Sequence, residues 1–294
     1  MTVEKSKISL NRIMRVAKNE YMKWIYNPRI IIFVVLFSFL YDYIIEEMLE
    51  AAEKMDAMIM IFEPFIAMAN SELLVLVIPA VFIVLICDFP KTDGNTMFYI
   101  SRVGKLNWLF GQLIFAVASA VTYLLGVLGI SIVMVAGHGY STNIWSPVIT
   151  DYTNQFPNEV KSRIPMLING RLYNNLTPNM ALMLSLAYLL LMLVVIELML
   201  LVGFSMGKRM LGILSAYVII GIGSSLCALE HSTMWIFPSA HSISWLHFDP
   251  ILKIQNVKIS TSFLYFVGIM LGMFVISIIT IKHYDFSKVT DMED

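Results

Sequence analysis

The sequence predicts an all-α protein that crosses a membrane six times. Three observations support this prediction: six long apolar runs, a small share of charged residues, and loops that differ in their content of Lys and Arg. Of the 294 residues, 58% are hydrophobic and 14% are charged, and the mean hydropathy is +0.76. A water-soluble domain carries more charge, so most of this chain is expected to face lipid or other helices.

A helix needs about 20 mostly apolar residues to cross a bilayer, and most of the runs reach or approach that length. The second run has to extend back to Phe65, because its uninterrupted apolar part begins only at Leu73. In the fourth run, inserting Glu197 costs on the order of 3 kcal/mol, but fourteen Leu, Ile, Val and Phe residues return roughly 6 kcal/mol. We therefore expect six spans, at approximately 30–45, 65–87, 108–136, 179–203, 210–229 and 262–281.

The distribution of positive charge predicts the orientation. Fourteen Lys and Arg residues lie in the N-terminal segment, the second and fourth connections and the C-terminal tail, and six lie in the other three loops. Cytoplasmic loops retain positive charge during insertion, so both termini are expected in the cytoplasm. Residues 1–29 would then precede a six-helix transmembrane domain at 30–281, and 282–294 would form a cytoplasmic tail.

The segment before the first span has apolar residues at helical spacing beside one basic face, from Ile8 to Ile25. Such an amphipathic helix lies in the cytoplasmic membrane interface, with Trp24 at headgroup depth and its cations near anionic lipid. Asn27 and Pro28 then end the helix before the chain turns into the membrane. The same residues also fit a generic positively charged anchor.

The connection after the second span is the most distinctive loop. Residues 95–102 form a short segment that would present Met97, Phe98 and Ile100 to the cytoplasm. Apolar side chains in that position need something to cover them. Either they dip back into the membrane interface, or they dock on a cytoplasmic partner.

These features together resemble the type-2 permease subunits of ATP-binding cassette exporters. The resemblance rests on the basic N-terminal helix, the six spans with both ends inside, and a Gly-Thr-rich coupling segment that ends in Ser-Arg. Asn95 is inserted between the Gly and the Thr of that motif, and the family's usual Pro is missing before Ser101. The coupling residues that the resemblance implies are Asp93, Gly94, Asn95, Thr96, Met97, Phe98, Ser101 and Arg102.

The resemblance implies a permease without catalytic, cofactor or metal residues of its own. ATP and Mg would be bound by a separate ATPase subunit in two copies, and a second permease copy or a homologous permease would complete the dimer. No nucleic-acid partner is expected. Short re-entrant helices are implied on the outer side, at about 234–252. The expected location is the plasma membrane of a bacterium, and the expected cargo is an amphipathic or antimicrobial peptide, with drugs, lipids and polysaccharides as open alternatives.

One stretch superficially resembles a nucleotide-binding loop, from Gly203 to Arg209. It is one residue shorter than the phosphate-binding motif, ends in Arg instead of Ser or Thr, and follows a membrane helix instead of a strand. We therefore reject it as a nucleotide site.

Three alternatives remain open at this point. An ion- or proton-coupled secondary transporter would use Glu197, with Glu72 and Asp42 as further intramembrane carboxylates. An intramembrane glutamate-type protease would use Glu46, Glu47 and His241, although the Arg and the second His motif of such proteases are missing. Copper handling would use a Met-rich outer stretch, whose residues more often fill helices: Met48, Met55, Met58 and Met60.

Overall fold

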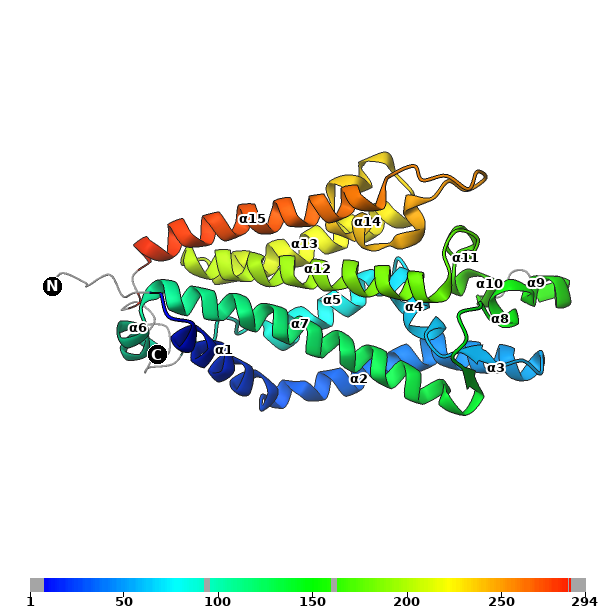
Figure 1. Ribbon diagram of the computed structural model, residues 1–294, viewed down its shortest axis with the longest axis horizontal. Helices are drawn as coiled ribbons and strands as arrows, with labels where there is room; N and C mark the ends of the chain where they lie inside the picture. Colours follow the sequence, from blue (N-terminus) through cyan, green and yellow to red (C-terminus); the bar gives the residue numbers. More distant parts are fainter. Residues whose placement is uncertain (1–7, 93–95, 160–162, 285, 287–294) are drawn as a thin grey trace.

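The computed structural model of this chain describes residues 8–92, 96–159, 163–284 and 286. The fold is all-α, with 78% of the residues in helices, and the long helices form an elongated bundle (Figure 1). Within the described residues, five helices are long and apolar enough to cross a membrane, and one bent pair is a sixth candidate. The prediction of an all-α polytopic membrane protein is confirmed at this level.

The bundle has two distinct ends, visible in Figure 1. One end carries the start of α1 (Leu10–Ile25), the short helix α6 (Thr96–Val103) and the end of α15 (Ile259–His283). We call this the α6 end. The opposite end, which we call the α3 end, carries α3 (Glu46–Lys54) and a group of short helices.

The five continuous candidate spans fall where the apolar runs predicted them. Four are single long helices: α7 (Lys105–Val135), α12 (Pro178–Ser205), α13 (Arg209–Ala228) and α15. The first is a continuous helical stretch made of η1 (Pro28–Ile30), α2 (Ile31–Leu40), a π-helical turn η2 (Tyr41–Ile45) and α3. It continues past Ile45, where the predicted span ended, because α3 buries Met48, Ala51 and Ala52 on one face and directs its carboxylates outward.

The second predicted span, 65–87, is not one helix, and this corrects the sequence prediction. It consists of α4 (Glu63–Asn70) and α5 (Leu74–Ile86), which meet at an angle of 88°. Between them, Ser71 adopts an extended backbone conformation, and its Oγ accepts a hydrogen bond from the Leu74 backbone N–H at 3.4 Å. The pair is therefore a broken span or a re-entrant loop.

The break between α4 and α5 is held by the buried side chain of Asn70. Its Nδ2 donates to the Ile66 carbonyl (2.9 Å) and to Ser185 Oγ of α12 (2.8 Å), and its Oδ1 accepts from the Ser244 backbone N–H (2.8 Å). The Asn70 carbonyl accepts from Trp245 Nε1 at 2.9 Å. Because leaving a buried polar group without a partner is costly, these contacts fix the bend to two other parts of the bundle.

The N-terminal helix α1 packs along the first turns of α7. The Ser9 backbone N–H donates to Asn107 Oδ1 (2.9 Å), and further along, the Tyr21 hydroxyl lies 2.9 Å from Thr122 Oγ1. A Cβ atom at Gly111 would lie 2.4 Å from Val16 Cβ, so the close approach of the two helices requires glycine. The helix predicted before the first span is thus present, and its interfacial position stays a prediction.

The turn between α12 and α13 accounts for the stretch that superficially resembles a phosphate-binding loop. Gly207 has a φ of +71°, which glycine adopts without strain, and the Lys208 backbone N–H caps α12 by donating to the Gly203 carbonyl at 2.8 Å. A Cβ atom at Gly203 would lie 2.7 Å from Gly212 Cα. These glycines therefore close a tight helical hairpin.

The connection from α13 to α15 folds back against the bundle as three short helices: η5 (Ser232–Ile236), α14 (Pro238–Ser242) and η6 (Ser244–His247). Ser262 of α15 anchors them, because its hydroxyl lies 2.8 Å from His241 Nδ1 and 2.7 Å from His247 Nε2. His241 Nε2 lies 2.9 Å from the Trp235 carbonyl, which can only accept. His247 Nδ1 likewise lies 3.2 Å from the Ile243 carbonyl. With neutral rings, each histidine therefore donates to a carbonyl, and the single Ser262 hydroxyl proton can be donated to only one of the two rings at a time.

The long connection between α7 and α12 is also structured. Its elements are η3 (Ala136–His138), β2 (Gly139–Tyr140), α8 (Pro147–Thr150), α9 (Tyr152–Gln155), η4 (Pro157–Glu159), α10 (Ile164–Leu167) and α11 (Gly170–Tyr173). Strand β2 pairs in parallel with β1 (Ile59–Met60), which precedes α4. The buried Glu63 carboxylate accepts from the backbone N–H and the hydroxyl of Ser146, both at 2.6 Å. This connection is therefore a small cap on the α3 end.

Candidate coupling site at the α6 end

The helix α6 lies in the segment that the sequence predicted for coupling. Phe98 is 66% exposed, in agreement with the sequence prediction. The prediction that Ile100 is exposed is wrong, because Ile100 is buried together with Val103 on the bundle side of this helix. Gly104, with a φ of 90°, turns the chain from α6 directly into α7. One face of α6 is therefore fixed on the bundle, and the other presents an aromatic side chain to the surroundings.

The predicted coupling residues are placed as follows. Five of the eight belong to α6: Thr96, Met97, Phe98, Ser101 and Arg102. Thr96 is buried, Arg102 is exposed, and Ser101 Oγ donates to the Phe98 carbonyl at 2.7 Å. Of Met97, the structure describes the helical backbone only. The other three lie outside the described residues: Asp93, Gly94 and Asn95.

The charged face of α1 lies close to α6. Burial raises the pKa of the Tyr99 hydroxyl on α6, and the Glu20 carboxylate on α1 raises this pKa further, while Lys23 and Arg15 lower it. Three charged residues of α1 thus act on one side chain of α6. The N-terminal helix therefore lies close to the predicted coupling segment at Tyr99.

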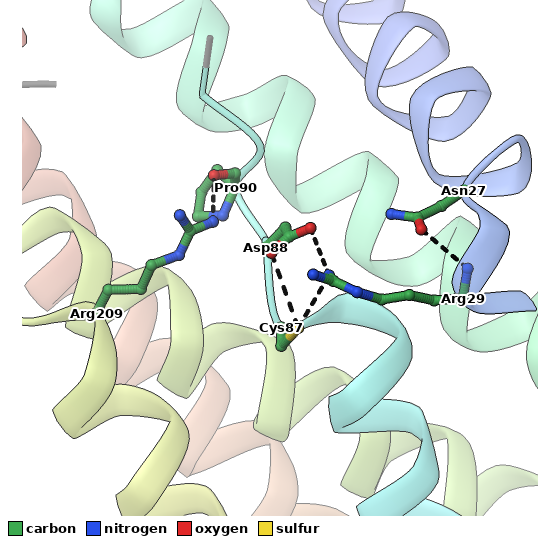
Figure 2. Close-up of polar contacts among 6 residues, drawn as sticks. All are labelled: Asn27, Arg29, Cys87, Asp88, Pro90 and Arg209. Atoms are coloured by element: carbon green, nitrogen blue, oxygen red, sulfur yellow. Dashed lines mark hydrogen bonds and ion pairs between the residues drawn. The ribbon is translucent and has the colours of Figure 1, made fainter. Parts of the chain in front are cut away.

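The chain between α5 and α6 is held from one side by Arg29 (Figure 2). The Arg29 guanidinium forms an ion pair with Asp88, and its Nη1 donates to Cys87 Sγ at 3.0 Å. Asn27 Oδ1 accepts from the Arg29 backbone N–H at 3.0 Å, which orients the turn that starts η1. The junction between α1 and the first span therefore holds the end of α5.

The same chain segment is held from the other side by Arg209, the first residue of α13. Its Nη2 donates to the Pro90 carbonyl at 2.9 Å, as Figure 2 shows. The guanidinium also lies over the Phe204 ring, 6.0 Å from its centroid. In the part of the chain that the structure describes, the buried Arg209 Nε has no hydrogen-bond partner. Residues 87–90 therefore lie between cations from two different helices.

A third connection joins the start of α7 to the end of α15. Lys105 Nζ donates to the carbonyl oxygens of Lys282 (3.2 Å) and Tyr284 (2.6 Å). Because α6 continues into α7 at this point, α6 is also connected to the end of α15. The short helix α6 and the chain on either side of it are thus linked to α1, α5, α7, α13 and α15.

Glu197, the predicted intramembrane carboxylate, lies apart from this site. It is on α12, eight residues and thus roughly 12 Å along the axis from the helix end at Ser205. Its side chain is fully buried, and Ser119 Oγ of α7 lies 2.6 Å from its Oε1. Among the described residues, Oε2 has no hydrogen-bond partner. The other two predicted carboxylates lie elsewhere, Asp42 in η2 and Glu72 at the α4–α5 break.

Some residues of the protease and copper alternatives are engaged in other contacts. Glu47 of α3 forms an ion pair with Arg163 at 3.0 Å, and His241 contacts Ser262. Met48 and Met60 are fully buried. The described residues contain no group of three or more His, Cys, Asp or Glu side chains arranged to hold a metal ion.

Comparison with known proteins found no matching family model, no matching curated protein and no matching solved structure.

Sequence reasoning missed the residues that hold the chain just before the predicted coupling segment. Arg29 and Arg209 contributed to the prediction only as positive charges near helix ends, and Asp88 only as the boundary of an apolar run. A charged pair at two span ends is a usable pattern, because an Arg and an Asp at the same membrane depth are expected to pair. The sequence does not show which spans are neighbours, so this pairing could not be assigned.

Proposed function

We propose that this chain is the membrane-spanning subunit of an ATP-driven exporter, and that α6 is its coupling helix. The observation that supports the proposal most directly is the way in which α6 is attached to the bundle. This helix has an exposed aromatic residue, Phe98, on one face, and the chain on either side of it is bound to several spans. A docking helix that transmits force needs both properties, a free apolar face and rigid connections.

In this proposal the α6 end faces the cytoplasm. Two ATPase subunits bind ATP and Mg and dock on α6 of two permease copies, or of this chain and a homologous permease. Closure of the ATPases on ATP then displaces α6. The ion pair between Arg29 and Asp88 and the bond from Arg209 to Pro90 carry the displacement to the first span and to α13. The location is the plasma membrane of a bacterium.

The proposed cargo is an amphipathic or antimicrobial peptide. The spans are mostly apolar, and most of the buried polar side chains in the described long helices are serines, so a transport pathway between them suits a molecule with a large apolar face. A drug, lipid or polysaccharide exporter would keep the same coupling site.

The docking assignment is tested by the substitution Phe98→Glu, alone and together with Met97→Glu. We expect the wild-type chain to co-purify with ATPase subunits, which are detected as vanadate-sensitive ATP hydrolysis. The variants should insert into the membrane normally but lose this co-purifying activity. Met166→Glu is the matched control, because Met166 is a similarly exposed apolar residue at the α3 end, 74% exposed. Retention of the ATPase by the Phe98→Glu variant would show that α6 is not the docking site.

A second candidate function, proton- or ion-coupled transport, is favoured by one specific observation. Glu197 is fully buried between α7 and α12 and has an oxygen without a partner in the described part of the chain. Such a carboxylate is suited to binding a proton or a cation. Transport into proteoliposomes that is driven by an imposed pH gradient, needs no nucleotide and disappears in Glu197→Gln would favour this function over the exporter.

A further inference from the structure

A cleft of about 580 Å³ lies at the α3 end, between the residues that follow α3 and the loop after β2. Its volume is within the range of small-molecule sites, roughly 300–1,000 Å³. The walls are largely apolar and aromatic, formed by Met55, Met58, Tyr140, Ile144 and Trp145. Among the described residues that line the cleft, Asp56 alone carries a formal charge.

The aromatic walls are fixed by hydrogen bonds. Trp145 Nε1 donates to the Leu176 carbonyl at 2.8 Å, and the Tyr140 hydroxyl donates to the Ile144 carbonyl at 3.0 Å. Burial raises the pKa of Tyr140 to about 12, and the nearby Glu63 carboxylate contributes to this shift. Tyr140 therefore offers a neutral ring at physiological pH, in an orientation that is already set.

The charge of Asp56 is not balanced by Lys54, the nearest cation along the chain. Lys54, two residues away, has its Nζ 3.0 Å from both carboxylate oxygens of Glu159, so these two residues neutralise each other. No hydrogen bond or ion pair engages the Asp56 carboxylate within residues 8–92, 96–159 and 163–284. Asp56 is exposed, and its φ of 48° is a conformation that Asp and Asn tolerate better than most residues. The cleft thus carries a net negative charge.

We propose that this cleft is a binding site for a small amphiphilic organic cation. Aromatic faces attract a cation through their quadrupole, and methionine side chains adapt to irregular apolar bodies. The cationic centre lies beside Asp56 and the faces of Trp145 and Tyr140, and the apolar body lies against the methionine side chains. This assignment rests on the cleft alone and does not depend on the proposed transport function.

The test uses tetraphenylphosphonium as the probe and tetraphenylborate as an anion of nearly the same shape. Binding is followed by tryptophan fluorescence and by calorimetry on the full chain in nanodiscs of zwitterionic lipid. We expect saturable binding of the cation, and no saturable binding of the anion. Trp145→Phe should remove the fluorescence change if the probe binds in this cleft.

Asp56→Asn should weaken cation binding about fivefold, because it removes one exposed charge contact, which is worth about 1 kcal/mol or less. Glu53→Gln is the matched control, since it removes the same charge three residues away, outside the cleft lining, and should leave binding unchanged. Met58→Lys, at a side chain that is 53% exposed, should weaken binding by adding a positive charge. Equal binding of the two probes, or an Asp56→Asn variant and a Met58→Lys variant that both bind like the wild type, would overturn the proposal.

Discussion

Arg29 and Asp88 form an ion pair that joins the start of the first span to the end of α5. The two residues are 59 positions apart in the chain, and the pair lies directly before the segment that leads to α6. Asn27 orients Arg29 from one side, and Arg209 holds the Pro90 carbonyl from the other. The proposed coupling mechanism depends on this connection being rigid.

The first prediction concerns this ion pair. Asp88→Asn should reduce cargo-stimulated ATP hydrolysis severalfold, because a displacement of α6 would no longer reach the first span. The loss in the free energy of unfolding should stay below about 1 kcal/mol, since the two side chains are 39% and 42% exposed and water screens the pair. Both effects are measured on the purified complex, by ATPase assay and by thermal unfolding.

The control for this prediction is Glu230→Gln. It breaks the ion pair between Arg171 and Glu230, which has an N–O distance of 2.9 Å and lies far from α6 along the chain. Its effect on stability should be similarly small, and its effect on ATP hydrolysis should be absent. Equal activities of the two variants would contradict a coupling role for Asp88.

The second prediction concerns the hairpin of α12 and α13. Gly203→Ala should lower the free energy of unfolding by about 1–3 kcal/mol, because the added Cβ would lie 2.7 Å from the Gly212 backbone and would force the helices apart. Gly221→Ala, on the same hairpin, is the control, since a Cβ there has no neighbour within 4 Å. Thermal unfolding in detergent should separate the two variants clearly. If both melt like the wild type, the close contact of α12 and α13 is wrong.

The third prediction concerns the histidines held by Ser262. Burial lowers the pKa of His247 to about 4, below its ordinary value of 6.5, and also lowers the pKa of His241. The unfolded chain therefore binds more protons than the folded chain between pH 6.5 and 4, so stability should fall as the pH decreases through this window. For one histidine the loss is at most about 1.4 kcal/mol per pH unit.

Thermal unfolding measured from pH 7.5 to pH 4 tests the histidine prediction. His247→Gln keeps a donor and an acceptor but does not titrate, so its melting temperature should depend less steeply on pH than that of the wild type. His231→Gln is the control, because His231 is exposed at the start of η5. Identical pH profiles for wild type and His247→Gln would contradict the buried, neutral state of His247.

The fourth prediction concerns the bend between α4 and α5. Asn70→Ala should destabilise the protein by about 1–3 kcal/mol, because the buried Ser244 N–H would lose its partner. Ser185→Ala removes only one of these contacts and should cost less. Thermal unfolding compares the two variants, and Asn70→Ala should have the lower melting temperature. A Ser185→Ala variant that is less stable than Asn70→Ala would argue against the central role of Asn70.

The sequence predicted the spans well where apolarity alone determines them. The helices α7, α12, α13 and α15 begin and end within a few residues of the predicted runs, because a long apolar helix in a membrane needs little tertiary information. The second span was mispredicted as one helix, because its bend depends on tertiary contacts. Its bend depends on Asn70 meeting Ser185 and Ser244, which are 115 and 174 residues away in the chain.

The candidate site was predictable in part. The short segment with the exposed apolar residue Phe98 could be found from the local sequence, but its helical fold and the burial of Ile100 could not. The contacts by which Arg29 and Arg209 hold residues 87–90 could not be found, because they depend on which span ends are neighbours. The charge count that predicted the orientation treats these two residues as equivalent to every other cation.

The central claim is that α6 couples the spans to an ATPase, and vesicle transport tests it most directly. The chain is purified with its ATPase subunits, reconstituted into proteoliposomes, and supplied with ATP and Mg on the outside together with a fluorescent amphipathic peptide. We predict peptide uptake that requires ATP, is inhibited by vanadate and is lost in Phe98→Glu. Uptake that proceeds without nucleotide, or that is unchanged in the Phe98→Glu variant, would contradict the account.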